Sequence, residues 1–388
     1  MTTIEFGDKR VNCWVASKDD IEPSALAQIA NVAQLPFLFH DVAIMPDVHC
    51  GYGVPIGCVF ATTGNVIIPN AVGVDIGCGM RACKTDLDVT DTSDLKKIMG
   101  LIRETVPVGF NHNTTPNVSA MPYSSSKFEV VPMEFASASK QIGTLGGGNH
   151  FIELQKDEKG YVWIMIHSGS RNLGKKIADH YCGVAKSLNA EWFSSVPAAY
   201  DLAFLPMSSE AGKAYFAEMN YALEFARANR ALMMNAVKQA VIDVIGEVDF
   251  EEDLDVHHNY AQIENHMGHN VMVHRKGATS AREGQLGIIP GSQGTASYIV
   301  RGKGSVLSFN SCSHGAGRKM GRKQAQRELD LENEKRVLDE QGIIHSVRNA
   351  KDLDEASGAY KDIDVVMTNQ SELVEIVTRL KPIAVIKG

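Results

Sequence analysis

Five short polar segments, most of them framed by glycine, constrain the fold of this chain more than any other feature. They are Gly73–Gly79, Gly146–Glu153, Trp163–Arg171, Asp255–Asn259 and Ser311–Lys319. Several of them follow apolar stretches of strand length, so their polar groups are expected at strand ends. Buried polar groups carry a desolvation cost unless they are paired, which makes core packing a poor explanation for all five. We therefore expect the fold to bring them together in one site.

The segment Ser311–Lys319 places His314 in a loop of small residues. Glycines let the backbone approach a ligand closely, and successive amide N–H groups can surround an anion. Arg318 and Arg322 follow at four-residue spacing where a helix is expected to begin, so cationic groups would face the same loop. His314 is thus placed to attack phosphorus or to bind a metal. For this segment alone, the alternative is a histidine satisfied within a glycine-rich turn.

The other segments offer metal donors. Asp75 and Cys78 lie three positions apart between glycines and can converge on one cation. Imidazoles come from His150, His167 and the pair His257–His258. Nitrogen, sulfur and carboxylate donors suit divalent manganese, zinc, iron or cobalt, and a bridging thiolate can hold two ions. Taken singly, each histidine is more often structural than a ligand, so the metal site is predicted from their combination.

With these segments, the chain resembles the RtcB family of RNA-splicing ligases. The matching motifs occur in order along nearly the whole chain and are Pro46–His49, Gly73–Cys78, Gly143–Glu153, Ile166–Arg171, His257–Tyr260, Ile289–Tyr298, Ser311–Arg322, Ala359–Asp364 and Val385–Gly388. The resemblance implies an enzyme that joins RNA ends bearing a 2′,3′-cyclic phosphate or 3′-phosphate to ends bearing a 5′-hydroxyl. GTP would be the co-substrate and Mn²⁺ the cofactor, in RNA repair or tRNA splicing.

The resemblance also implies roles for individual residues. One manganese ion would be held by Asp75, Cys78 and His150, and the second by Cys78, His167 and His258. His314 would be the catalytic nucleophile that becomes guanylylated. The residues expected to bind the guanylate or GTP are Asn149, His150, Phe151, Ile152, Glu153, His258, Asn259, Pro290, Gly291, Ser292, Gln293, Ser297, His314, Gly315, Ala316, Gly317 and Lys387.

Glu153 would accept hydrogen bonds from guanine N1 and N2, which adenine does not offer in the same geometry. Asp47 and His49 have two open roles: they orient a neighbouring ligand, or they handle the proton of the 5′-hydroxyl. The positions at which the motifs vary within the family are Cys50, Tyr52, Met80 and Gln293. They bear on RNA preference rather than on chemistry, and they are compatible with a paralogous group used in RNA repair.

The charge balance does not itself indicate a nucleic-acid partner. The chain has 46 acidic and 38 basic residues, a net charge of −8, whereas nucleic-acid-binding domains are commonly basic. A local groove needs only local charge, and basic residues follow His167, lie at 274–276 and follow His314. We expect Arg171, Arg318 and Arg322 to contact RNA phosphates. For the lysines, ordinary solvated helix faces are the alternative.

Length alone would allow two or three domains. We expect a single domain over residues 1–388, because the candidate metal donors and His314 span positions 75 to 314 and, by the family resemblance, Lys387 matches a nucleotide-contacting position of the same site. No apolar run approaches the roughly 20 residues needed to cross a bilayer, and the N-terminus lacks a signal-peptide pattern. The sequence therefore predicts a cytoplasmic protein without a membrane partner. Seven cysteines without a C-x-x-C pair favour reduced thiols.

Apolar periodicity predicts an α+β fold. Short strands are expected over Val42–Met45, Gly57–Thr62 and Val66–Pro69, and helices over 20–35, Asp91–Thr105, Ser209–Val248 (one long helix or a pair) and Gly317–Asp339. Pro107–Tyr123 is expected to be a loop that folds over RNA or nucleotide. Strands interleave with helices without a regular β-α-β pattern, which predicts one compact unit with mixed or antiparallel sheets flanked by helices.

Two other functions stay open on sequence alone. A binuclear metal-dependent phosphoesterase would use the same donors, since two metals and an imidazole also suit hydrolysis. A non-catalytic RNA-binding paralogue would retain the fold, although the intact Asp75, Cys78 and His314 weigh against it. The motifs identify no activating protein.

Overall fold

A seven-stranded sheet supplies most of the predicted site. The computed structural model describes residues 1–88, 91–125, 127–251 and 253–388. The strands of this sheet are β6 (Gly79–Lys84), β7 (Phe151–Asp157), β8 (Val162–Ser168), β10 (Leu254–His257), β14 (Leu286–Ile289), β15 (Ser297–Gly302) and β17 (Val374–Lys387). Their order is β10-β6-β8-β7-β17-β15-β14, and every neighbouring pair is antiparallel. β7 and β8 are buried over most of their length, so the sheet is a central layer.

A six-stranded sheet lies beside it. Its strands are β1 (Thr2–Phe6), β2 (Lys9–Cys13), β3 (Leu38–His49), β4 (Ile56–Thr62), β11 (Asn259–His266) and β12 (His269–Lys276), in the order β1-β2-β3-β4-β12-β11. The β2–β3 pair is parallel and the others are antiparallel, so this sheet is mixed. Two small pairs complete the strands: β5 (Val66–Ile67) with β9 (Leu205–Pro206), and β13 (Ala278–Ser280) with β16 (Ser311–Ser313).

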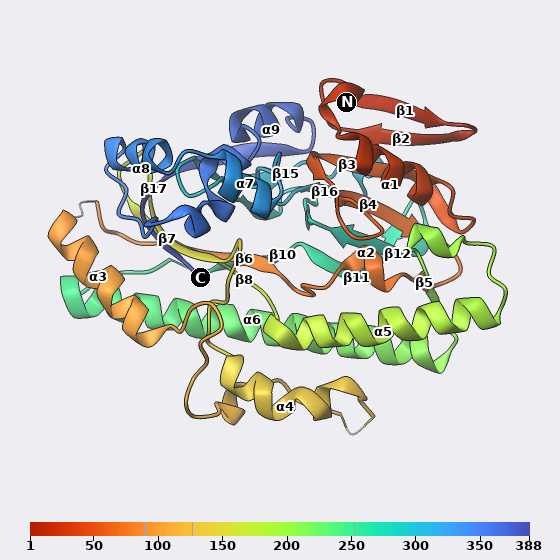
Figure 1. Cartoon of the computed structure of the whole chain (residues 1–388), viewed down its shortest axis with the longest axis horizontal. Helices are drawn as coiled ribbons and strands as arrows, with labels where there is room; N and C mark the ends of the chain where they lie inside the picture. Colours follow the sequence, from red (N-terminus) through yellow and green to blue (C-terminus); the bar gives the residue numbers. More distant parts are fainter. Residues whose placement is uncertain (89–90, 126, 252) are drawn as a thin grey trace.

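Long helices cover one side of the sheets. The helices are α1 (Pro23–Ala33), α2 (Pro69–Val72), α3 (Thr92–Thr105), α4 (Val130–Gln141), α5 (Arg171–Glu191), α6 (Glu210–Ile245), α7 (Arg322–Glu328), α8 (Leu331–Glu340) and α9 (Ile363–Asn369). Figure 1 shows α5 and α6 as a layer beneath the strands, with α4 on the outer side of that layer and α7 to α9 on the opposite side of the molecule. The predicted α+β class, with mixed and antiparallel sheets, is confirmed.

The predicted long helix is the single 36-residue α6. Ser209 caps its N-terminus by accepting a hydrogen bond from the amide of Gly212. Its apolar positions recur at helical spacing and are buried, and the three methionines Met219, Met233 and Met234 are fully buried, which confirms them as core residues.

Several predicted boundaries were wrong; the strand expected over Val42–Met45, for example, is the longer β3 (Leu38–His49). Two other differences have a clear local cause. The expected helix over Gly317–Asp339 is two helices, α7 and α8, because Leu329 and Asp330 have extended backbones and the Asp330 side chain caps α8 through the amide of Asn333. The expected strand over Val66–Pro69 ends at Ile67, since Pro69 is the first residue of α2. The segment Pro107–Tyr123 contains only a 3-10 turn and one isolated β-bridge, as expected for a loop.

All seven thiols are free, in agreement with the prediction of reduced cysteines. Within the described residues, no helix combines the length and the hydrophobicity needed to cross a membrane.

Candidate active site

A cavity of about 470 Å³ forms where strand ends of the two large sheets face the loops after β14 and β16. The predicted site residues that line it are Asp75, Cys78, Asn149, His150, Phe151, His167, His258, Asn259, Pro290, Gly291, Ser292, Gln293, His314, Gly315, Ala316, Gly317, Arg318, Arg322 and Lys387. Four predicted site residues do not line it: Ile152, Glu153, Arg171 and Ser297. The fold thus brings together segments more than 200 positions apart in the sequence.

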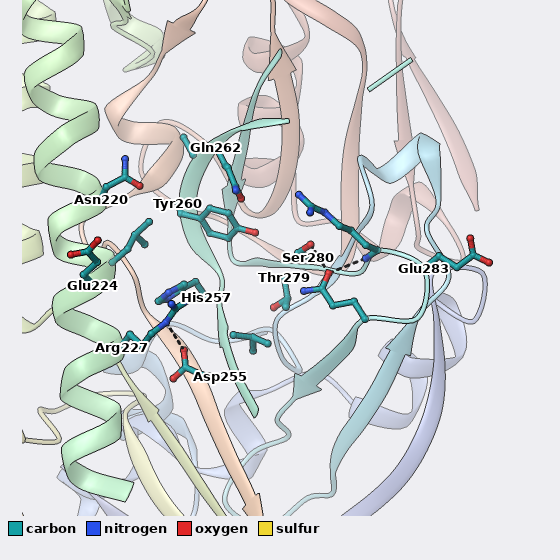
Figure 2. Close-up of a pocket in the computed structure, with 15 residues that line it drawn as sticks. Asn220, Glu224, Arg227, Asp255, His257, Tyr260, Gln262, Thr279, Ser280 and Glu283 are labelled. Carbon is teal, nitrogen blue, oxygen red and sulfur yellow. Dashed lines mark hydrogen bonds and ion pairs between the residues drawn. The ribbon is translucent and has the colours of Figure 1, made fainter. Parts of the chain in front are cut away.

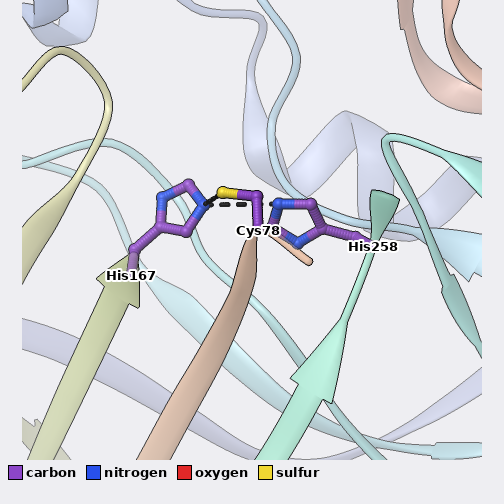
Figure 3. Close-up of side chains that lie close together, drawn as sticks. All are labelled: Cys78, His167 and His258. Carbon is purple, nitrogen blue, oxygen red and sulfur yellow. Dashed lines mark hydrogen bonds between the residues drawn. The ribbon is translucent and has the colours of Figure 1, made fainter. Parts of the chain in front are cut away.

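The predicted metal donors lie together at one end of this cavity. Cys78, directly before β6, has its Sγ 3.2 Å from His167 Nε2 and 3.5 Å from His150 Nε2. His167 Nε2 is in turn 3.4 Å from His258 Nε2, and Figure 3 shows these two rings on either side of the Cys78 thiol. Asp75 Oδ2 lies 3.1 Å from His150 Nε2. Cys78 is therefore common to two groups of three donors, each with its ligand atoms within 4.8 Å of one another.

Backbone carbonyls orient two of the imidazole rings. His150 Nδ1 lies 3.0 Å from the carbonyl of Leu145, and His167 Nδ1 lies 3.0 Å from the carbonyl of Asn149. Each Nδ1 therefore carries the proton and donates it, which leaves the Nε2 lone pair directed at the cluster. Among the residues that the structure describes, His258 Nδ1 is buried without a hydrogen-bond partner.

Burial sets the protonation states in this cluster. Desolvation lowers the pKa of His167 and of His258 well below the ordinary value, so both rings are neutral at physiological pH. Desolvation raises the pKa of the Cys78 thiol well above its ordinary value. Burial opposes ionisation of Asp75 as well, but its interaction with the nearby His150 imidazole leaves the pKa of this carboxyl below its usual value.

This donor set fits divalent metal ions. Neutral imidazoles, a thiol and a carboxylate are the ligands of borderline transition metals, and a nearby cation would favour the Cys78 thiolate that burial disfavours. Gly169 leaves room for the Asp75 carboxylate at the cluster, because a Cβ at this position would lie 2.3 Å from Asp75 Oδ1. The cluster can thus hold metal ions with Cys78 between them.

His314 faces the same cluster from the end of β16. Its ring centroid lies 4.7 Å from that of His258. Its Nδ1 lies 2.7 Å from Asp47 Oδ2, and its backbone amide donates to the same oxygen over 3.1 Å. Asp47 is fully buried near the end of β3, and its other carboxylate oxygen has no hydrogen-bond partner within the described part of the chain. Because Nδ1 is held by Asp47, Nε2 is the ring nitrogen left free for chemistry. This pairing favours the orienting role for Asp47.

Comparison with known proteins matches this chain to the family model described as tRNA-splicing ligase RtcB, over residues 28–131 and 123–388. An RNA-splicing ligase RtcB1 of Escherichia coli is 40% identical over 95% of both chains. An RNA-splicing ligase RtcB of Escherichia coli strain K12 is 39% identical over 95% of both chains. The chain belongs to the RtcB family. A more distant member, the tRNA-splicing ligase RtcB of Thermococcus kodakarensis, is 32% identical over 94% of this chain and 91% of its own.

In this RtcB-family chain, Phe151 and Lys387, two of the residues predicted to bind the guanylate, line the cavity where β7 begins and β17 ends. Lys387 Nζ lies 5.3 Å from the centre of the Phe151 ring. Glu153 is buried behind them and receives a hydrogen bond of 2.6 Å from Gln155, which also bonds to Ser297 Oγ. Desolvation raises the pKa of Glu153 to about 7. The side chain of Ile152 points the other way, into the hydrophobic core with Leu154.

The three predicted RNA-binding arginines differ in what they contact. Arg318 donates to Glu355 Oε2 over 2.8 Å and to the carbonyls of Asp354 and Met320. Arg322 donates to Glu355 Oε1 over 2.9 Å, but its side chain remains 54% exposed. Arg171 donates to Thr144 Oγ1 and to the carbonyl of Gly109. Arg322 is thus the one of these three with a largely solvated side chain.

The predicted basic group at 274–276 is not on the surface. Arg275 is fully buried and pairs with Glu264 of the neighbouring strand. His274 accepts a hydrogen bond from the amide of Ile68 inside the core. Lys276 reaches the cavity, where it donates to the carbonyls of Tyr52 and Asn70, and desolvation lowers its pKa to about 8.

A buried arginine that the sequence motifs did not reveal supports the cluster from behind. Arg230 of α6 pairs with Asp255 and donates to the carbonyls of Gly77 and Ser168, next to Cys78 and His167. The sequence contained one signal of this buried role: Arg230 lies on the apolar stripe of α6, four residues after Ala226 and three before Met233.

His257 faces away from the cluster into a second cavity of about 630 Å³, between α6 and strands β10, β11 and β13 (Figure 2).

Proposed function

We propose that this chain is a GTP-dependent RNA ligase that joins 3′-phosphate or 2′,3′-cyclic phosphate ends to 5′-hydroxyl ends. The observation that carries the proposal is the shared cavity, in which His314 lies next to a two-centre donor cluster in a chain belonging to the RtcB family. The E. coli relatives are named RNA-splicing ligases, which makes RNA the expected substrate.

His314 is the proposed nucleophile. Asp47 holds the Nδ1 proton, so the Nε2 lone pair attacks the α-phosphorus of GTP. An N–P bond forms, the bond to the β-phosphate oxygen breaks, and pyrophosphate leaves. The GMP then passes to the RNA 3′-phosphate and His314 is restored. In the last step the 5′-hydroxyl attacks the activated 3′-phosphate, loses its proton to a base or to water, and releases GMP.

Two Mn²⁺ ions are the proposed occupants of the donor cluster. Asp75, Cys78 and His150 would hold one ion, and Cys78, His167 and His258 the other. When bound, such ions neutralise charge on phosphoryl oxygens and lower the pKa of bound water, which would open a cyclic phosphate. The hydrogen bonds of His150 and His167 to backbone carbonyls hold the two rings in the orientation needed to coordinate a metal ion through Nε2.

The proposed guanylate site lies beside His314. Phe151, Lys387 and the turn Pro290–Gln293 line the cavity there. Glu153 would accept hydrogen bonds from guanine N1 and N2, and Gln155, which also donates to Ser297, holds that carboxylate in place. The small residues Gly315, Ala316 and Gly317 would offer amides to the phosphates. Gly317 has a φ of +75°, and a Cβ there would lie 2.2 Å from the carbonyl oxygen of Asp47, so the tight turn around His314 needs glycine.

We also infer that residues 1–388 act as one catalytic domain. The donors lie just before β6 and β7, in β8 and at the β10–β11 junction, the nucleophile follows β16, and Lys387 ends β17. A separation at any point between residues 75 and 387 would divide the proposed site.

The test is incubation of the protein with Mn²⁺ and α-labelled GTP, followed by mapping of the labelled residue. Label on His314 is expected, whereas γ-labelled GTP should leave none because pyrophosphate departs. A phosphoesterase or a non-catalytic RNA-binding protein would take up no label from either nucleotide. Label on a residue other than His314 would overturn the assigned nucleophile while leaving nucleotide transfer in place.

A further inference from the structure

Phe110 is a fully exposed aromatic residue, with its side chain 100% accessible to solvent. Single exposed apolar residues are common on protein surfaces and need no explanation by themselves. Phe110 differs because its backbone is anchored on both sides to one segment of the chain, residues 140–146, that leads directly into the cavity.

Hydrogen bonds fix the loop around Phe110. Before it, the amide of Gly109 donates to the carbonyl of Gly146 over 2.9 Å, and the amide of Leu145 donates to the carbonyl of Pro107 over 2.9 Å. After it, Asn113 donates to the carbonyl of Lys140 through its amide and to that of Ile142 through Nδ2. The ring is therefore presented to solvent by an ordered backbone.

The anchor lies at the rim of the cavity. Gly147 lines the cavity, and a Cβ on it would be only 3.7 Å from the Cα of Gly109, the residue before Phe110. Arg171 donates to the carbonyl of that same Gly109 over 3.3 Å. Phe110 thus directly follows Gly109, which lies beside the cavity-lining Gly147 and accepts a hydrogen bond from Arg171.

We propose that Phe110 stacks on a nucleobase of the RNA strand that enters the cavity, which rests on the ligase function proposed above. Aromatic rings beside cationic side chains are the common platform for single-stranded nucleic acids, because every base has a face to stack and every nucleotide has a phosphate. Stacking reads no particular base. This contact therefore suits an enzyme that must hold an unpaired RNA end while its terminal phosphate reaches His314.

The test uses a single-stranded RNA ending in a 3′-phosphate, with 2-aminopurine placed in turn at the last few nucleotides. Binding is measured without GTP, so it does not depend on catalysis. One label position should be quenched on the wild-type protein and should recover in Phe110→Ala, with an RNA Kd about tenfold weaker because the stacking contact is lost. Phe110→Trp should restore both.

Phe193→Ala is the matched control. Phe193 is 93% exposed but follows the opposite end of α5 from Arg171, about 30 Å away along a helix of 21 residues. This variant should leave the RNA Kd and the quenching unchanged. Both variants should keep the wild-type thermal stability, because neither ring is buried, and both should form the GMP adduct at the wild-type rate.

The outcomes separate this proposal from the ligase function. If Phe110→Ala binds RNA as Phe193→Ala does, with quenching intact, the stacking role is overturned even when the adduct and the ligated product form normally. If the wild-type protein takes up no label from GTP but its RNA affinity still depends on Phe110, the ligase function fails and the RNA contact stands.

Discussion

The two ends of the cavity are built on opposite principles. At one end, Cys78, His150, His167 and His258 turn their donor atoms toward one another, and backbone carbonyls behind His150 and His167 hold those two rings. At the other end, the guanidinium of Arg318 is already satisfied by Glu355 and by two backbone carbonyls. The first end is complementary to a cation that is not part of the protein. At the second end, the Arg318 guanidinium already has its hydrogen-bond partners within the protein.

This difference separates residues whose donor atoms are free to bind a ligand from residues whose polar groups are already paired within the protein. Neutral imidazole nitrogens 3.4 Å apart and a thiol beside them gain little from each other in a buried position, so an ion would improve all of their interactions. Arg318 would have to give up an ion pair with the buried Glu355 before it contacted a phosphate. The donor end should therefore control chemistry, and the arginine end should control stability and RNA affinity.

The largest effect is expected from Cys78→Ala. Removing the donor common to both groups should abolish both the GMP adduct and ligation, because charge on the α-phosphate is no longer neutralised. Label transfer from α-labelled GTP and the manganese content of the protein are the measurements. Cys312→Ala and Cys182→Ala are the controls, since neither residue lines the cavity, and both should change little. An adduct formed by Cys78→Ala at the normal rate would refute the shared role.

Replacement of His314 should divide the reaction into its steps. His314→Ala should lose the adduct entirely but keep its manganese, because His314 belongs to neither donor group. It should still seal an RNA supplied with a preformed guanylylated 3′ end, since that step needs no histidine nucleophile. Failure on this activated RNA, with the metal content unchanged, would give His314 a second role in sealing.

The donor end could be predicted from the sequence because its chemistry is local. Asp75, Cys78 and each histidine carry their donor atoms in the side chain, and every one of them lies at or next to a strand end or turn. The pairing of Asp47 with His314 joins residues 267 positions apart and depends on the end of β3 meeting the turn after β16. Sequence motifs identified both residues but not their contact.

The arginine end could not be predicted in the same way. Four-residue spacing placed Arg318 and Arg322 on one helix, yet α7 begins only at Arg322, and Arg318 turns toward Glu355. That carboxylate belongs to a 3-10 turn, Ala350–Glu355, that no motif marked. Likewise, Arg275 was grouped with surface cations, but its partner Glu264 comes from the adjacent strand β11. Long side chains choose partners through tertiary contacts that spacing does not encode.

Arg318→Ala and Arg322→Ala should differ in kind. Arg318→Ala leaves Glu355 with one cation fewer in a buried position and should lower the free energy of unfolding by about 3 kcal/mol. Arg322→Ala should affect stability little, because the side chain is half exposed, but should weaken RNA binding and reduce the slope of log affinity against log salt by about 0.7. Thermal unfolding and salt titrations measure the two effects. Equal stability losses in both variants would remove the distinction drawn here.

Substitutions in the proposed guanylate site should have a moderate effect on GTP binding. Glu153→Ala removes the proposed acceptor for guanine N1–H and N2–H and should weaken GTP binding by about 1–3 kcal/mol. Deletion of Lys387 and Gly388 should do likewise, since Lys387 lines the cavity beside Phe151. Calorimetric titration with GTP gives the affinities. If both variants keep full affinity, the base binds elsewhere and the assigned guanylate site is wrong.

The smallest expected effect is a pH dependence of guanine binding that comes from Glu153. Its pKa is raised to about 7 by burial, and only the carboxylate can accept from both guanine N–H groups. The ionised fraction rises from about one tenth at pH 6 to about nine tenths at pH 8, so binding of guanosine should strengthen by roughly tenfold over that range. Guanosine is the probe because it has no phosphate that titrates there. Glu153→Gln should bind guanosine with no such dependence.

The stability of the free protein should move in the opposite direction. The folded-state pKa of Glu153 lies above the ordinary value of 4.5, so the folded protein holds this proton more tightly than the unfolded chain does. Its contribution to stability is therefore complete below pH 4.5 and is lost as the pH rises through about 7. Relative to Glu153→Gln, the wild-type protein should lose thermal stability across this interval while its affinity for guanosine increases. A wild-type affinity that falls with rising pH, or that matches the variant throughout, would show that this carboxylate does not receive the base.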